Sequence, residues 1–202
     1  MKKQLVLFIL SVAILANSCK VVGTLYPLSQ NVNDFVFKKG IIGKWGDSKD
    51  SSGHYTVDTV SGAGGKLYEI EIVSYNKEKN TADILRLNAH LVNINGLLYL
   101  DSWFDIKNEL NAIDKSYEDW LIARHFIIRL SFPEINVLEM VAPDTEELIK
   151  LIDQKKISLH YASLKKDDYL ILDKPAVLQK GLAESKKYPM LFKNKNVLHR
   201  LE

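Results

Sequence analysis

Short apolar segments separated by tight polar turns are the feature that most constrains the fold of this chain. Along residues 67–73, apolar side chains alternate with glutamates, which is typical of a strand with one solvated face. The pair Asn95-Gly96 stands between two apolar runs and predicts a hairpin, because a type I′ turn needs positive φ at both central residues. The predicted strands are 41–45, 54–60, 67–73, 85–94, 97–104, 120–132, 135–141, 157–164, 169–172 and 197–201.

Two helices are predicted late in the chain. Asp144 is a suitable N-cap for the first, and Glu147 follows three residues later, as in a capping box. The second helix is expected from about 173 to 187, with Pro175 in its first turn, where a missing amide hydrogen costs nothing. Strands and helices do not alternate, which argues against a Rossmann-like or TIM-like fold. We therefore expect a mainly β chain: a single antiparallel β-barrel or strongly curved sheet, with two short helices in the C-terminal half.

Cys19 is the only cysteine, and it ends a short apolar N-terminal segment. Lys2 and Lys3, followed by the apolar residues 5–16, are typical of a secretory signal peptide. With the cysteine directly after it, the segment resembles a bacterial lipoprotein signal, although Ala16 stands where a leucine-like residue is usual. This resemblance implies a diacylglycerol on the Cys19 thiol, removal of residues 1–18, and acylation of the new N-terminus by a chain such as palmitate.

Two other interpretations of the N-terminus were weighed. An ordinary secretory signal that happens to contain a cysteine stays open. A transmembrane anchor is disfavoured, because the apolar run is shorter than the roughly 20 residues that a helix needs to cross a bilayer. Lipidation also accounts for an exported chain with one unpaired cysteine, since no disulfide partner exists.

Processing at Cys19 sets the expected domain organisation. Residues 1–18 are the lipoprotein signal peptide, 19–39 a lipidated tether and lead-in, and 40–202 the β domain. Removing the signal deletes two of the 27 basic residues and none of the 25 acidic ones, so the remaining chain is charge-balanced. Such a chain gives no electrostatic reason to expect nucleic-acid binding. Lys20 is not the aspartate that retains such lipoproteins in the inner membrane. The resemblance therefore implies an outer-membrane lipoprotein of the bacterial cell envelope, facing the periplasm or the cell surface.

Gly43-Lys44-Trp45 on the first predicted strand resembles the Gly-x-Trp signature of lipocalins. Together with Cys19, the mature chain is similar to the lipocalin-like lipoproteins of bacterial envelopes, many of which have no assigned function. The resemblance implies that Trp45 closes one end of a barrel and that Arg200, near the C-terminus, packs on it. The alternative is that Trp45 is a core aromatic residue in some other small β domain.

Catalytic and metal-binding patterns are weak throughout the sequence. The five histidines are scattered singly, without metal-ligand spacing, and each is more simply a hydrogen-bonded strand residue. Residues 62–66 look superficially like a phosphate loop, but Leu67 follows where Ser or Thr is needed. We therefore expect no catalytic residue, no metal and no cofactor.

Arg124 is the one charged residue on an otherwise apolar face of the predicted strand 120–132. It could hold the carboxylate or phosphate head of an amphipathic ligand, since arginine binds such groups in a bidentate manner. The alternative is that Arg124 reaches the barrel rim or pairs with Asp101 or Asp105. The candidate ligand-binding residues are Trp120, Ile122, Arg124, Phe126 and Ile128.

Two functions remain open at this point, both for a protein held to the membrane by an N-terminal lipid. In the first, the barrel interior binds a small apolar or amphipathic ligand. In the second, the barrel is filled by side chains and serves as a non-catalytic module that binds or assembles with an envelope protein partner. The volume of the cavity inside the barrel distinguishes the two functions, because small-molecule pockets measure several hundred Å³. An enzyme is a third choice and would need polar side chains converging in a cleft.

Overall fold

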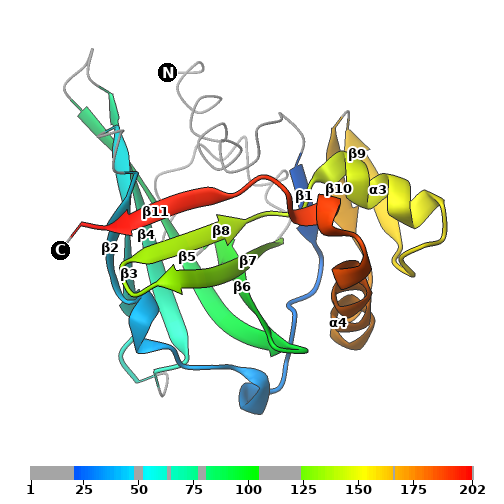
Figure 1. The fold of residues 1–202 in the computed structure, drawn as a ribbon, viewed down its shortest axis with the longest axis horizontal. Coiled ribbons are helices and arrows are strands. Elements are labelled where there is room, and N and C mark those ends of the chain that lie inside the picture. Colours follow the sequence, from blue (N-terminus) through cyan, green and yellow to red (C-terminus); the bar gives the residue numbers. More distant parts are fainter. Residues whose placement is uncertain are drawn as a thin grey trace, which may run out of the picture.

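The computed structural model describes residues 21–47, 52–62, 65–76, 81–104, 124–165 and 167–201 (Figure 1). The expected signal peptide and Cys19 lie outside these ranges, as do Trp120, Ile122 and Asp105.

Strands dominate the described residues, and the two α-helices lie in the C-terminal half, as expected. The strands are β1 (Val21–Thr24), β2 (Gly43–Gly46), β3 (Gly53–Thr59), β4 (Leu67–Asn76), β5 (Thr81–Ile94), β6 (Leu97–Phe104), β7 (His125–Glu134), β8 (Val137–Val141), β9 (Tyr161–Lys165), β10 (Asp168–Ile171) and β11 (Asn196–Arg200). The helices are α3 (Thr145–Asp153) and α4 (Pro175–Glu184), and short 3-10 turns are η1 (Val32–Asp34), η2 (Lys39–Ile41), η4 (Ser185–Lys187) and η5 (Pro189–Phe192).

Eight strands close into an antiparallel barrel (Figure 1). From β2 to β8 each strand pairs with the next along the chain, and β11 then pairs with both β8 and β2. The last contact joins Arg200 to Trp45 in register and completes the ring. Closure leaves these eight strands without a free edge, and it confirms the predicted barrel.

A small side sheet of β1, β10 and β9 attaches to the barrel at β7. The attachment is the pair Thr24↔His125, and β1 runs parallel to β10 with Val21 opposite Asp168. Helices α3 and α4 lie on the same side of the barrel as this sheet (Figure 1). The parallel pair was not expected, because β1 and β10 have four residues each and lie far apart in sequence.

Local sequence signals account for the best-predicted elements. Asn95 and Gly96 have φ of 51° and 80°, as the β5–β6 hairpin requires. Asp144 caps α3 by accepting a hydrogen bond from the Glu147 amide at 3.1 Å. The reciprocal half of a capping box does not form, because the Asp144 amide donates to the Leu191 carbonyl instead.

The apolar core has two parts, one inside the barrel and one outside it. Inside, alternate residues of the eight strands pack together, among them Trp45, Tyr68, Leu91 and Leu100, each at most 1% exposed. Outside, opposite faces of β5 to β8 pack against the two helices and the side sheet. The outer core is formed by Leu28, Val92, Ile94, Tyr99, Ile127, Val141, Leu148, Leu151, Ile152, Ile157, Leu159, Ile171, Leu178, Leu182, Leu191 and Phe192. Strand β5 therefore loses its alternation at Leu91 and Val92, which are both buried.

The structure changes three details of the sequence analysis. From Val21 onward, the segment assigned to a tether and lead-in packs on the barrel: Leu28 is fully buried, and Phe35 bridges to Val92. This segment carries isolated apolar residues without a repeating pattern, so its burial left no periodic signal. The first predicted strand begins at Gly43, after η2. The predicted strand 157–164 begins at Tyr161, after an irregular buried stretch.

Trp45 and Arg200 meet as the lipocalin resemblance implied. Trp45 is fully buried and donates from Nε1 to the Ile41 carbonyl at 2.8 Å. The Arg200 guanidinium lies 4.4 Å from the centre of the Trp45 ring and donates to the carbonyls of Ile42 and Gly40. At Gly43, whose φ is +135°, an added Cβ would collide with this guanidinium. The glycine and the tryptophan are thus both explained by the position of Arg200.

We expect Trp45→Ala to lower the free energy of unfolding by about 3–5 kcal/mol, because it empties a site that is fully enclosed. Urea unfolding followed by circular dichroism measures this change. Lys44→Ala is the matched control on the same strand, since Lys44 points to solvent and should change stability by less than about 0.5 kcal/mol. Equal effects of the two substitutions would contradict the closing role of Trp45.

Candidate functional site

The middle of the barrel interior is packed. Trp45, Tyr68, Ala89 and Leu91 have no exposed surface, and the other core residues inside the barrel are at most 8% exposed. A side chain that lines a ligand-sized void keeps accessible surface toward that void, and these side chains retain almost none. The described residues therefore fill the middle of the barrel.

Half-buried apolar side chains lie at the two ends of the barrel. At one end, here called the Trp45 end, residues 36–42 cross the opening, and the Lys38 amide donates to the Tyr68 hydroxyl at 2.8 Å. At the other, the Phe104 end, β6 and β7 lead into residues 105–123. Phe104 and Phe126 face each other there in an edge-to-face pair, with ring centres 5.6 Å apart.

A cavity of about 30 Å³ lies in the outer core, not in the barrel. It is lined almost entirely by apolar groups, among them Val22, Ile127, Leu148, Ile157 and Leu178. Since one water molecule needs roughly 10–15 Å³ of such space, this cavity is far too small for a metabolite.

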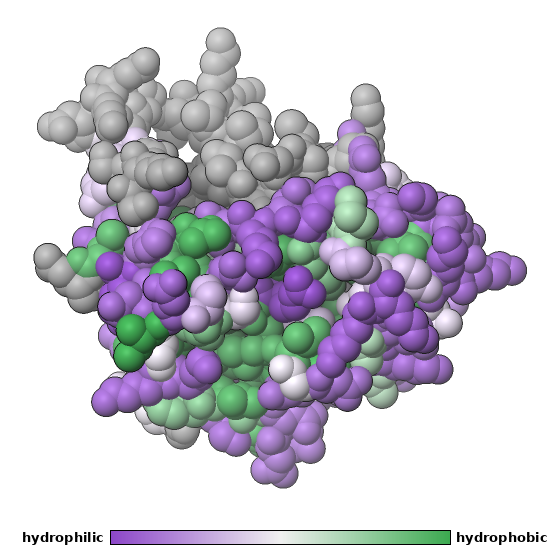
Figure 2. Space-filling view, viewed as in Figure 1, coloured by the Kyte–Doolittle hydropathy of each residue, from purple (hydrophilic) through white to green (hydrophobic). Residues whose placement is uncertain are grey.

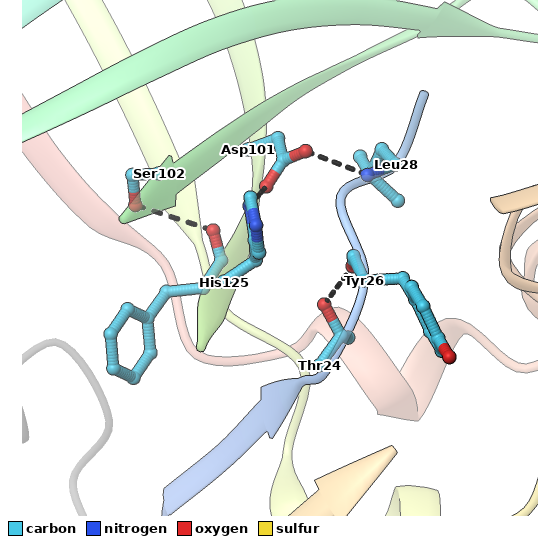
Figure 3. A network of polar contacts seen from close by, with 7 residues as sticks. Thr24, Tyr26, Leu28, Asp101, Ser102 and His125 are labelled. Carbon is cyan, nitrogen blue, oxygen red and sulfur yellow. Dashed lines mark hydrogen bonds and ion pairs between the residues drawn. The ribbon is translucent and has the colours of Figure 1, made fainter. Parts of the chain in front are cut away.

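A buried carboxylate on the outer face of β6 organises a polar network (Figure 3). Asp101 is fully buried and accepts a hydrogen bond from the Leu28 amide at 2.6 Å and one from His125 Nδ1 at 2.7 Å. Beside it, the Thr24 hydroxyl donates to the Tyr26 carbonyl at 2.7 Å. One carboxylate oxygen therefore holds the N-terminal segment through the Leu28 amide, and the other binds His125 of β7. A buried carboxylate needs such partners.

A row of rings continues this network across the barrel's outer face. Phe35 stacks on His90 at 3.8 Å, His90 lies 5.1 Å from Trp103, and Trp103 lies 5.4 Å from His125. His90 Nδ1 is 2.8 Å from the Lys66 carbonyl. The row fastens the N-terminal segment to β5, β6 and β7, and it gives His90 and His125 structural partners. The sequence shows these histidines only singly, so nothing in it pointed to the row.

Arg124 lies outside the barrel, contrary to its expected inward position. Its Nη1 is 2.7 Å from Asp168 Oδ1 on β10, whereas Asp101 pairs with His125 and Asp105 lies outside the described residues. The side chain passes over β1, where a Cβ added at Gly23 would lie 3.0 Å from Arg124 Cδ. Arg124 precedes the first residue of β7, so the alternation of that strand does not govern its direction.

The structure does not bring all the candidate ligand-binding residues together. Ile128 faces the packed interior, and Phe126 contacts Phe104 at the barrel end. Arg124 is on the outside with Asp168, whereas Trp120 and Ile122 lie outside the described residues.

We expect Asp101→Asn to lower the free energy of unfolding by about 1–3 kcal/mol, because one of two buried donors then faces an amide NH2 in place of an acceptor. Urea unfolding measures the loss, and hydrogen exchange at the Leu28 amide should become faster. Asp83→Asn, on an exposed position of β5, is the control and should change little. Unchanged exchange at Leu28 would show that Asp101 does not hold this segment.

Among the described residues, no group of three or more His, Cys, Asp or Glu side chains is arranged to hold a metal ion. None of the helices in the described ranges has the length and apolar character needed to cross a membrane. No protein-family model matches the chain, and neither the curated proteins nor the solved structures contain a match.

Proposed function

We propose that this protein is a lipid-anchored protein of the bacterial envelope whose barrel is a rigid, non-catalytic interaction module. The observation that carries this proposal is the packed barrel interior. A barrel filled by its own side chains offers no space of the several hundred Å³ that a small-molecule site needs. Function then belongs to the outer surface, where apolar side chains gather in the lower middle of the face in Figure 2, surrounded by polar ones.

The anchor is part of the same proposal and rests on the sequence. Cys19 ends an apolar signal-like segment and is the only thiol in the chain. Acyl chains on Cys19 would provide the membrane attachment, since the mature chain is charge-balanced overall. Lys20 favours the outer membrane as the destination.

A small amphipathic ligand remains the second candidate function, and one observation favours it. Phe104 and Phe126 are half-buried at the Phe104 end of the barrel, where an apolar chain could contact them. Recognition of an anionic head by Arg124 would have to compete with Asp168, which already pairs with this guanidinium at 2.7 Å. Such a ligand would therefore sit shallowly at the barrel end.

We expect Cys19→Ser to release the protein from the membrane. Labelling of cells with an alkyne fatty acid should mark the wild type and leave Cys19→Ser unmarked, because the substitution removes the thiol that carries the lipid. Ser18→Ala keeps both the cysteine and a small residue before it, so it should be labelled like the wild type. Equal labelling of wild type and Cys19→Ser would refute the anchor.

The filled barrel is tested with a fluorescent fatty-acid probe and the soluble Cys19→Ser protein. We expect no saturable binding of the probe, because side chains occupy the barrel interior. Adding Arg124→Gln should leave the probe signal unchanged, because the Arg124 guanidinium is already paired with Asp168. Native mass spectrometry of gently extracted mature protein should find any additional mass in the range of a protein, not of a metabolite. Saturable one-to-one binding that Phe126→Ala weakens would overturn the filled-barrel proposal and support the second candidate.

A further inference from the structure

The first strand of the domain begins two residues after Cys19, which leaves almost no tether. We propose that the edge of the domain formed by Val21 and by the adjoining ends of β9 and β10, at Leu164 and Asp168, lies against the lipid bilayer. This edge is called the anchor edge below. The inference rests on the proposed lipidation of Cys19, and it adds the orientation that lipidation would impose on the domain.

Strand β1 is firmly held, so it cannot act as a flexible extension of the tether. All four of its residues pair with β10, from Val21↔Asp168 to Thr24↔Ile171, and Thr24 also pairs with His125 of β7. Just after the strand, the Leu25 amide donates to the Ile171 carbonyl at 2.9 Å. The chain is thus part of the folded domain from Val21 onward.

The chain between Cys19 and the folded domain is very short. Two peptide steps separate Cys19 from Val21, and since an extended chain advances at most ~3.6 Å per residue, the two Cα atoms stay within ~7 Å. The acyl chains on Cys19 must enter the bilayer, so Val21 stays close to the lipid headgroups. Residues that lie beside Val21 in the sheet share this position.

The chemistry of the anchor edge suits a bilayer surface. Val21 pairs with Asp168, and Asp168 pairs with Lys165 across the next strand, so the turn lies beside the start of β1. Leu164 is 40% exposed there, and Lys165 and Lys166 follow it in the sequence. An exposed apolar side chain at this edge favours contact with the bilayer interface.

Asp168 of the anchor edge is paired. Asp168 forms its 2.7 Å ion pair with Arg124, and both side chains are less than one-fifth exposed. Asp168 therefore adds little repulsion toward anionic lipid.

The orientation has a consequence for the rest of the domain. In Figure 1, β1 lies in the upper part of the view, and the chain runs from it down one side of the barrel to η1 at the lower edge. The Lys66 ammonium donates to the Val32 carbonyl there at 3.0 Å, which joins η1 to the β3–β4 connection. With the anchor edge on the bilayer, this lower side points away from the membrane toward possible partners.

The test uses mature lipidated protein in vesicles of phosphatidylethanolamine and phosphatidylglycerol that contain a spin-labelled lipid. Leu164→Cys carries an environment-sensitive fluorophore at the anchor edge, and Val32→Cys, 64% exposed in η1, is the matched control. Cys19 is blocked by its lipid, so only the new thiol reacts. We expect the spin-labelled lipid to quench the fluorophore several-fold more strongly at Leu164→Cys than at Val32→Cys. Ser163→Cys, also on β9, serves as a second reporter if Leu164→Cys does not fold.

The outcomes separate the inference from the proposed function. Protein that does not float with the vesicles would refute the anchor itself. Protein that floats but shows equal quenching at the two positions would refute the anchor edge and leave the anchor standing. Insertion of a flexible Gly-Ser linker of about twelve residues between Lys20 and Val21, with a mean span of ~20 Å, should reduce quenching at Leu164→Cys. Unchanged quenching would contradict the argument from tether length.

Discussion

The contact between Arg200 and Trp45 joins the last barrel strand to the first, and the rest of the domain depends on this closure. The guanidinium covers the indole at 4.4 Å and also donates to the carbonyls of Ile42 and Gly40, so one side chain holds the ring, the strand and the turn before it. Gly43 provides the space for this arrangement. Because Arg200 lies at the end of β11, the barrel cannot close until the chain as far as β11 is present.

The long insertion between β8 and β11 has a structural explanation in the outer core. Residues of β5 to β8 that point away from the barrel are apolar over part of their length, so a barrel alone would expose Val92, Tyr99 and Ile127 to water. The helices and the side sheet cover them, and the N-terminal segment adds Leu28. Two cores sharing one sheet also explain why Asp101 and Ser102 are buried in the middle of β6, where both faces are covered.

The sequence predicted what depends on neighbouring residues and missed what depends on distant ones. The Asn95-Gly96 hairpin, the Asp144 cap and the alternation of β4 are local, and each appears as expected. The parallel pair of β1 and β10 and the Arg124–Asp168 ion pair join segments far apart in the chain, and no local pattern predicts them. The Asp101 network was missed for the same reason: its partners are the Leu28 amide and a histidine on another strand.

A filled barrel makes the orientation of the domain important for its proposed function, and a short tether would fix that orientation. A binding cavity can work in any orientation, because a small ligand diffuses to it. A protein that acts through its surface must present the correct face. With the lipid that we propose on Cys19, a domain that starts two residues later would have little freedom to turn. The pairing of β1 with β10 and β7 would transmit the position of the proposed anchor to the barrel without a flexible joint. In that case the side sheet does more than cover apolar residues, since the orientation of the whole domain would follow from the position of residue 21.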